Sequence, residues 1–283
     1  MRTEPDLRED LLRFGRLCYE RHLLVAMDGN LSVRLPSGQV LCTRAGCHKG
    51  FLTDDDLLVV DAEGRVRRGQ GRPTSEVFMH LACYRERPDV RAVIHAHPPL
   101  CVAFTIAGLS MDRCVLPEVV LTLGSIPTAP YRTTGTPDLA ELIGEYVRSW
   151  DAILMDTHGA ICVGPDLLTA FCRLETMEHT ALILKTAQDL GGVRNLPPEE
   201  AVRLRRLGLE RYGGPPTAVA TLHQPGTDLP DTCVTPAQPF RLLRVTSKPL
   251  ATLHEPASRS AAPALDANVE EAVVREVIKA MKA

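Results

Sequence analysis

Residues 92–99 read AVIHAHPP, an apolar stretch that carries two histidines and ends in two prolines. The apolar run predicts a β-strand, in which residues i and i+2 point to the same face, so the imidazoles of His95 and His97 can reach one metal ion. The prolines end the strand and leave both histidines at its mouth. The pair fits equally well two histidines that only pack on a half-buried strand, so it needs support from elsewhere in the chain.

A third histidine occurs in residues 154–164, LMDTHGAICVG. A predicted strand ends at Asp156, and His158 with Gly159 forms the turn that follows it. By itself, a histidine at this position is an ordinary turn residue. Three neutral imidazoles at strand ends, however, make a catalytic type of zinc site, with one position open for substrate.

Residues 71–77, GRPTSEV, form a candidate anion pocket. Thr74 and Ser75 open a predicted helix, and their hydroxyls and the free N–H groups of its first turn favour a phosphate. Glu76 in that turn is either a charge that the helix dipole favours or an acid/base carboxylate beside the metal.

Two loop residues are candidates for the same pocket. Asn30 can offer its side-chain amide to a phosphate, and Gly46 in TRAGCHKG lets backbone approach a ligand closely. Both residues fit ordinary turns equally well.

The rest of residues 1–212 alternates predicted helices with short predicted strands. The helices are expected at 5–27, 74–87, 137–149 and 165–190, and the strands at 30–35, 39–43, 57–61, 92–96, 118–123, 152–156 and 160–163. This mixture predicts a layered α/β or α+β domain over residues 1–212.

The chain changes character after Tyr212. Nine prolines fall between residues 215 and 263, which predicts an extended linker over 213–265. In residues 266–283, apolar side chains recur every four residues from Val269 to Met281, which predicts an amphipathic terminal helix.

The composition excludes several classes of protein. Of the 283 residues, 45% are apolar and the net charge is -3, with no sustained basic cluster for nucleic acid. The N-terminal residues lack the apolar core of a signal peptide, and no apolar run approaches the roughly 18 residues that a membrane span needs. We therefore expect a cytoplasmic protein with neither a nucleic-acid nor a membrane partner.

Six motifs occur in an order that resembles a known family. They are GNLSVR (29–34), TRAG (43–46), GRPTSE (71–76), AVIHAHP (92–98), IPTAPYRTTGT (126–136) and DTHGAI (156–161). Over roughly residues 8–212 the chain resembles the class II aldolase/adducin family, and within it most the L-fuculose-1-phosphate aldolases.

The resemblance implies a three-layer αβα sandwich around a mainly antiparallel sheet. It also implies a four-fold homotetramer with active sites between neighbouring subunits. By this resemblance the zinc ligands would be His95, His97 and His158, and the acid/base would be Glu76. The phosphate would bind to Asn30, Gly46, Thr74 and Ser75.

The implied activity belongs to carbohydrate metabolism. A zinc-dependent lyase of this kind cleaves a phosphorylated ketose, such as L-fuculose 1-phosphate, to dihydroxyacetone phosphate and an aldehyde such as lactaldehyde. The metal stabilises an enediolate, and Glu76 moves a proton to or from it.

One departure concerns the aldehyde. The fuculose-phosphate aldolases carry a tyrosine that protonates the aldehyde side, and this chain has Leu116 there, in VLPEVVLTLGSIP. Glu118 is a substitute or a structural residue. A second family tyrosine, near the C-terminus, is matched by the candidate catalytic residue Tyr212.

Other members of the family set the alternatives. A ribulose-phosphate 4-epimerase, a methylthioribulose-phosphate dehydratase and some decarboxylases share the metal and phosphate pockets. A non-catalytic, adducin-like interaction module is a further alternative, but retention of the three histidines and Glu76 argues against it.

The terminal helix at 266–283 allows two interpretations. After its Pro/Ala-rich tether it resembles the encapsulation peptides that bind shell proteins of bacterial microcompartments, and confinement suits an enzyme that makes a reactive aldehyde. Equally, it fits a helix that packs on its own tetramer.

Overall fold

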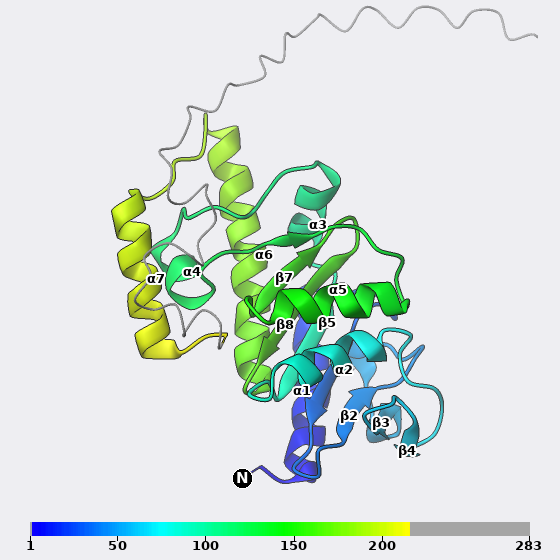
Figure 1. Ribbon diagram of the computed structural model, residues 1–283. Coiled ribbons are helices and arrows are strands. Elements are labelled where there is room, and N and C mark those ends of the chain that lie inside the picture. Colours follow the sequence, from blue (N-terminus) through cyan, green and yellow to red (C-terminus); the bar gives the residue numbers. More distant parts are fainter. Residues whose placement is uncertain (1, 216–283) are drawn as a thin grey trace, which may run out of the picture. The chain divides into compact units, whose positions relative to one another are not determined.

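The computed structural model describes residues 2–215, and the predicted terminal helix and nearly all of the predicted linker lie outside these residues. Figure 1 shows the described elements. The helices are α1 (Glu4–Glu20), α2 (Val77–Glu86), α3 (Pro99–Ile106), α4 (Pro117–Thr122), α5 (Pro137–Val147), α6 (Leu167–Asp189) and α7 (Pro198–Tyr212), with short 3-10 helices η1 (Lys49–Phe51) and η2 (Asp54–Asp56). The strands are β1 (Asn30–Arg34), β2 (Val40–Thr43), β3 (Leu57–Val60), β4 (Val66–Arg68), β5 (Ala92–Ala96), β6 (Thr128–Ala129), β7 (Ala152–Met155) and β8 (Gly159–Gly164).

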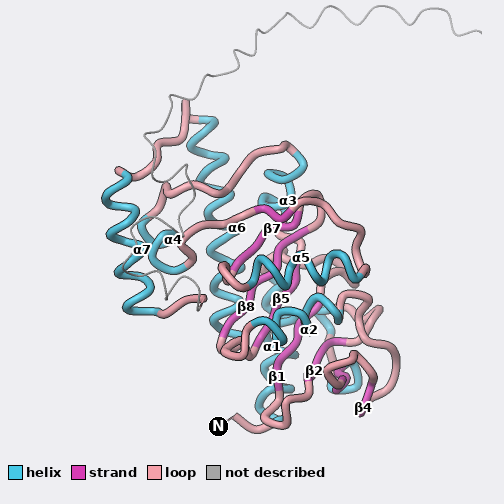
Figure 2. Tube along the Cα trace, viewed as in Figure 1, coloured by secondary structure: helices cyan, strands magenta, loops and turns pink. Residues whose placement is uncertain are grey.

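One eight-stranded sheet runs through the described residues in the order β4-β3-β2-β1-β5-β8-β7-β6. Neighbouring strands pair antiparallel, except that the edge strand β6 pairs parallel with β7. Figure 2 shows these strands between helices that cover both faces. The predicted αβα sandwich with a mainly antiparallel sheet is therefore confirmed.

Each face of the sheet has its own hydrophobic core. Helices α2 and α5 cover one face, where Met79 and Ile143 pack with Val93 of β5. Helices α1, α3 and α6 cover the other, where Phe14 packs with Ile94. Since side chains alternate along a strand, the residue after Ile94, which is His95, faces the layer of α2.

Helix α4 replaces the strand that the sequence predicts at 118–123, and that prediction is wrong. Pro117 occupies the first turn, where its fixed φ suits a helix, and Thr122 Oγ1 donates to the Glu118 carbonyl at 2.7 Å. Val120 packs with Leu204 of α7 in a small separate core. Packing against another helix has overridden the strand propensity of the valines.

The first two predicted helices have different bounds in the structure. Helix α1 ends at Glu20 instead of 27, because His22 (φ 57°) and Ala26 (φ 49°) adopt left-handed backbone conformations. Helix α2 begins at Val77, after a turn closed by a hydrogen bond from the Val77 N–H to the Thr74 carbonyl at 3.1 Å. Helices α3 and α7 and strands β4 and β6 were not predicted. Within the described residues, no helix has the length and hydrophobicity that crossing a bilayer requires.

Candidate metal-dependent active site

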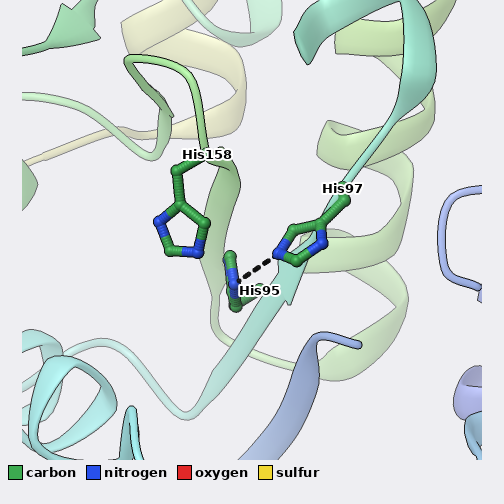
Figure 3. A group of neighbouring side chains, drawn as sticks. All are labelled: His95, His97 and His158. Atoms are coloured by element: carbon green, nitrogen blue, oxygen red, sulfur yellow. Dashed lines mark hydrogen bonds between the residues drawn. The ribbon is translucent and has the colours of Figure 1, made fainter. Parts of the chain in front are cut away.

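The three histidines that the sequence singles out lie together (Figure 3). Each offers one ligand nitrogen, and these nitrogens all lie within 4.8 Å of one another. His95 is the last residue but one of β5, His97 lies just beyond the strand, and His158 lies in the turn between β7 and β8. The antiparallel pairing of Ala96 with Ala160 brings the end of β5 beside the start of β8, so the topology of the sheet produces the cluster.

Gly159 permits this close approach. A Cβ at this position would lie 2.5 Å from the Ala96 carbonyl oxygen and 2.6 Å from Cδ2 of His97. Any other residue would therefore push β8 away from β5 next to the histidines.

The hydrogen bond of His95 fixes its tautomer. Its Nδ1 lies 3.0 Å from the Ala160 carbonyl oxygen, which can only accept, so Nδ1 carries the proton. In the neutral ring, Nε2 then presents a lone pair, and this atom lies 3.0 Å from Nε2 of His97. A ring held through Nδ1–H with Nε2 free is the usual arrangement of a metal-ligating histidine.

Glu76 faces the same point. Its Oε2 lies 3.1 Å from Nε2 of His95 and its Oε1 lies 3.2 Å from Nε2 of His158. Burial raises the pKa of Glu76, but when the imidazoles are protonated the charge of His95 and hydrogen bonds from His158 and His95, together with the Asn30 amide, outweigh it and lower the pKa below its ordinary value. The carboxylate is therefore ionised.

This donor set fits a divalent cation. A carboxylate and imidazole lone pairs at these distances repel one another unless a positive charge lies between them. Burial foremost, and then the charges of His95 and His158, lower the pKa of His97 to about 4, so its ring is neutral near pH 7, as a ligand must be. His97 has the most exposed side chain of the four residues, at 26%, which leaves that side open to substrate.

The structure also brings the predicted phosphate residues together. Asn30 Nδ2 donates to Thr74 Oγ1 at 3.0 Å and to Glu76 Oε2 at 2.9 Å. The Ala45 N–H donates to the Arg72 carbonyl at 2.9 Å, so the loop that ends at Gly46 runs beside the segment that leads to Ser75.

Two of these residues face open space. Gly46 is exposed with φ +71° and has no atom within 4 Å of where a Cβ would stand. Ser75 is also exposed, and the loop at Gly135 approaches it: a Cβ on Gly135 would lie 3.4 Å from Ser75 Cβ. These residues therefore come from three neighbouring loops, and Gly46 and Ser75 are exposed.

The structure does not place Tyr212 with this group. Tyr212 ends α7, its side chain is 58% exposed, and α7 packs on α4 (Figure 1). Leu116 and Glu118, at the start of α4, line a different hollow, shared with Glu175 of α6.

The sequence analysis missed a buried polar chain on α2. His80 Nδ1 lies 2.7 Å from Ser32 Oγ, which lies 2.8 Å from the Tyr84 hydroxyl. This chain joins α2 to β1, two residues after Asn30, and burial foremost lowers the pKa of His80 to about 3. The spacing of His80, four residues after Glu76, could have predicted its place near the site, because residues i and i+4 lie on the same helix face.

A model of the family described as class II aldolase and adducin N-terminal domain matches residues 9–184. Among curated relatives, a 3-oxo-tetronate 4-phosphate decarboxylase of Haemophilus influenzae is 34% identical over 190 residues, 66% of this chain and 90% of the relative. An L-fuculose phosphate aldolase of Methanococcus maripaludis is 32% identical over 176 residues, 62% of this chain and 94% of the relative.

Solved structures agree with these relatives. A putative aldolase/epimerase/decarboxylase from Escherichia coli has a TM-score of 0.66 and 31% identity, over 71% of this chain and 98% of the other. An L-fuculose 1-phosphate aldolase has a TM-score of 0.67 and 28% identity, over 72% of this chain and 96% of the other.

Proposed function

The chain belongs to the class II aldolase and adducin family and is a lyase of that family, and from this premise we propose that it breaks a carbon–carbon bond of a phosphorylated keto sugar. The observation that carries the proposal is the convergence of three imidazole nitrogens on an ionised carboxylate, beside a pocket of amide, hydroxyl and glycine backbone. The non-catalytic, adducin-like alternative is set aside, since its kind of module needs no such group.

We assign the metal to His95, His97 and His158, with zinc as the ion that best suits three neutral imidazoles. When bound, such an ion supplies Lewis-acid stabilisation of negative charge on substrate oxygens. Glu76, ionised and 3.1 Å from His95, holds and releases a proton at the carbon next to the ketone.

The phosphate of the substrate is assigned to Asn30, Gly46, Thr74 and Ser75. Thr74 and Asn30 are already bonded to each other, which fixes the depth of the pocket, and Gly46 and Ser75 are exposed at its mouth.

For an L-fuculose 1-phosphate type of substrate, the C3–C4 bond breaks. The C4 hydroxyl loses its proton as C4 becomes the aldehyde carbon of lactaldehyde, and C3 gains a proton to give dihydroxyacetone phosphate. Because Glu76 starts as a carboxylate, we expect it to take up the proton that the C4 hydroxyl releases, directly or through solvent, and then to deliver a proton to C3.

A second candidate is decarboxylation of a phosphorylated 3-oxo sugar acid. Loss of CO2 from a 3-oxo-tetronate 4-phosphate also gives dihydroxyacetone phosphate. In both reactions the bond that breaks joins the carbon beside the ketone to the leaving group. Loss of CO2 from a carboxylate releases no hydroxyl proton and so needs no group to accept one, and Leu116 in place of a tyrosine therefore favours this candidate, as does the relative of that name. A ribulose-phosphate 4-epimerase would need a proton donor at that position.

The assembly and the ends of the chain complete the proposal. In this proposal residues 1–212 are the catalytic domain of a homotetramer, and Tyr212, exposed at the end of α7, acts in the site of a neighbouring subunit. Residues 213–265 tether the helix at 266–283, which we propose binds microcompartment shell proteins, so that the enzyme works in the cytoplasm or inside such a compartment.

The test is metal analysis with a substrate panel. L-fuculose 1-phosphate, L-rhamnulose 1-phosphate, L-ribulose 5-phosphate and 3-oxo-tetronate 4-phosphate are each incubated with metal-loaded enzyme. Dihydroxyacetone phosphate with aldehyde supports the aldolase, and dihydroxyacetone phosphate with CO2 supports the decarboxylase. A chain that binds no divalent metal, or whose activity survives chelation, contradicts both.

A further inference from the structure

Lys49 is a buried cation that the roles assigned so far do not use. It begins η1, it is 2% exposed, and its Nζ donates to the Met27 carbonyl at 2.7 Å and the Cys47 carbonyl at 2.9 Å. In the part of the chain that the structure describes, no carboxylate lies within 4.0 Å of this ammonium group.

Two other cations of the described residues form ion pairs with carboxylates. The guanidinium of Arg87, equally buried, lies 3.1 Å from Asp151 and 2.6 Å from Asp89. Arg44, near the same loop as Lys49, lies 2.7 Å from Asp56. Arg34 also donates to backbone carbonyls, but it is only half-buried, whereas Lys49 is fully buried with carbonyl oxygens as its hydrogen-bond partners.

Such a group is costly to bury. Removal of an ammonium ion from water costs several kcal/mol, and an ammonium group has three protons, of which two carbonyls use two. Burial lowers the pKa of Lys49, and nearby charges at Cys47, Asp28, Glu76 and Asp56 oppose that shift. An anion that binds close by would compensate the charge far better than the carbonyls do.

The two carbonyls identify where that anion lies. Met27 precedes Asn30 by three residues, and Cys47 follows Gly46 by one. Lys49 therefore ties together the two loops that carry Asn30 and Gly46. Both loops turn through glycines with positive φ, Gly29 at +62° and Gly46 at +71°, and Gly46 faces open space.

We infer that Lys49 is the buried counter-charge of the substrate phosphate and sets the preference of this site for a phosphate dianion over a neutral hydroxymethyl group. It acts as a positioning and specificity-determining residue: it holds the two loops by their carbonyls and adds positive charge beneath them. At 2% exposure it need not touch the ligand, because charge acts over several ångströms in a water-poor wall. This inference rests on the proposed phosphate pocket.

Two substitutions separate charge from loop positioning. Lys49→Gln removes the charge but keeps two N–H donors for the two carbonyls, and Lys49→Met keeps the length without either. Lys185→Met is the matched control, because it removes one lysine charge from an exposed i,i+4 pair with Asp189 on α6.

The measurements use the metal-loaded full-length enzyme. Inorganic phosphate is titrated while the melting temperature is followed, since a ligand that binds the folded state raises the melting temperature more, at a given concentration, the more tightly it binds. KM and kcat are then measured with the phosphorylated substrate, and bound metal is counted.

Both Lys49 variants should bind phosphate about tenfold or more weakly, the size expected for loss of a charge-assisted interaction. KM should rise by the same factor, with kcat and metal content within about threefold of wild type. The ligand-free melting temperature of Lys49→Met should stay close to that of wild type, because removal of the buried charge offsets the loss of its two hydrogen bonds to carbonyls. Lys185→Met should match wild type throughout.

Wild-type phosphate affinity in Lys49→Gln would overturn the inference, whatever Lys49→Met does. If Lys49→Met fails to fold, Lys49→Gln still decides the matter. If wild-type enzyme binds neither phosphate nor a phosphorylated sugar, the proposed function itself fails, which is a different result from equal binding by wild type and variant.

Discussion

Strands β5 and β7 carry a cluster of buried ionisable groups at each end, and the two clusters are built on opposite plans. Before the strands begin, Asp151 lies 3.1 Å from Arg87 and 2.7 Å from Arg173, and Arg87 also donates to the Val147 carbonyl at 2.9 Å. Every close contact there joins opposite charges or a donor to an acceptor.

Where the strands end, the groups of the histidine cluster face one another as acceptors. Nε2 of His95 lies 3.0 Å from Nε2 of His97 and 3.1 Å from a carboxylate oxygen of Glu76. Buried atoms without a hydrogen-bond partner among the described residues gather here, at Asn30 Oδ1 and His158 Nδ1. A cluster that satisfies itself stabilises the fold, and one that does not is arranged for a ligand.

Loss of a ligand at the acceptor-rich end should have the largest effect. We expect His95→Asn to abolish metal binding and to lower kcat/KM by more than about a hundredfold, since even partners outside the ligand shell cost 10–100-fold. Metal analysis and a steady-state assay check this, with exposed His179→Asn as control. Full metal content in His95→Asn would contradict the assignment.

The next largest effect is expected at the carboxylate. Glu76→Gln keeps the size and the acceptor oxygen but cannot move a proton, so kcat should fall by about 10²–10⁴-fold. The variant should still bind metal, because the three imidazoles remain. Loss of metal together with activity would make Glu76 a ligand instead of an acid/base.

A substitution in the ion-paired cluster at the start of β7 should lower the stability of the protein and leave metal binding unchanged. Asp151→Asn leaves Arg87 and Arg173 buried beside a neutral amide, and breaking such a pair costs about 3–5 kcal/mol. Urea unfolding should show this loss, while metal bound per folded molecule and kcat stay within about threefold of wild type. A selective loss of metal would erase the contrast between the two clusters.

The smallest effect at neutral pH is expected at His80, which lies beneath the histidine cluster and changes stability only in acid. The folded-state pKa of His80, lowered to about 3, is below the unfolded value near 6.5. The unfolded chain therefore binds the extra proton first, so stability is full above about pH 6.5 and falls as pH drops towards 3, by up to about 1.4 kcal/mol per pH unit.

His80→Gln should flatten part of that decline. Urea unfolding at pH 7, 6, 5 and 4 compares it with wild type and with His179→Gln, a substitution of an exposed histidine. Identical slopes in all three proteins would show that His80 does not contribute.

Most of the metal site could be predicted from the sequence, but less could be predicted of the strand contacts and helices around it. The strand period placed His95 and His97 on one face, and family motifs added His158 and Glu76. The contact between β5 and β8 that unites them depends on the pairing of Ala96 with Ala160, 64 positions further along the chain, which no local pattern predicts. The strand prediction at 118–123 also failed because of a contact between distant residues. Val120 of α4 packs against Leu204 of α7, and that packing favours a helix.

Charged groups were the least predictable. Lys49 lies in a segment without apolar periodicity, so neither its burial nor its two carbonyl partners could be predicted from the sequence. Asp151 and Arg87 are 64 residues apart and look like ordinary surface residues until the fold buries them together.

The close fit at Gly159 bears on which ion the site accepts. Because backbone atoms of β5 and β8 touch there, the separation of His97 from His158 is set by the sheet and cannot relax as flexible side chains do. We therefore expect the spacing of the two imidazoles, and with it the ionic radius that suits the site, to depend on this main-chain contact. A change of residue at 159 should alter the ranking of divalent cations before it alters the substrate.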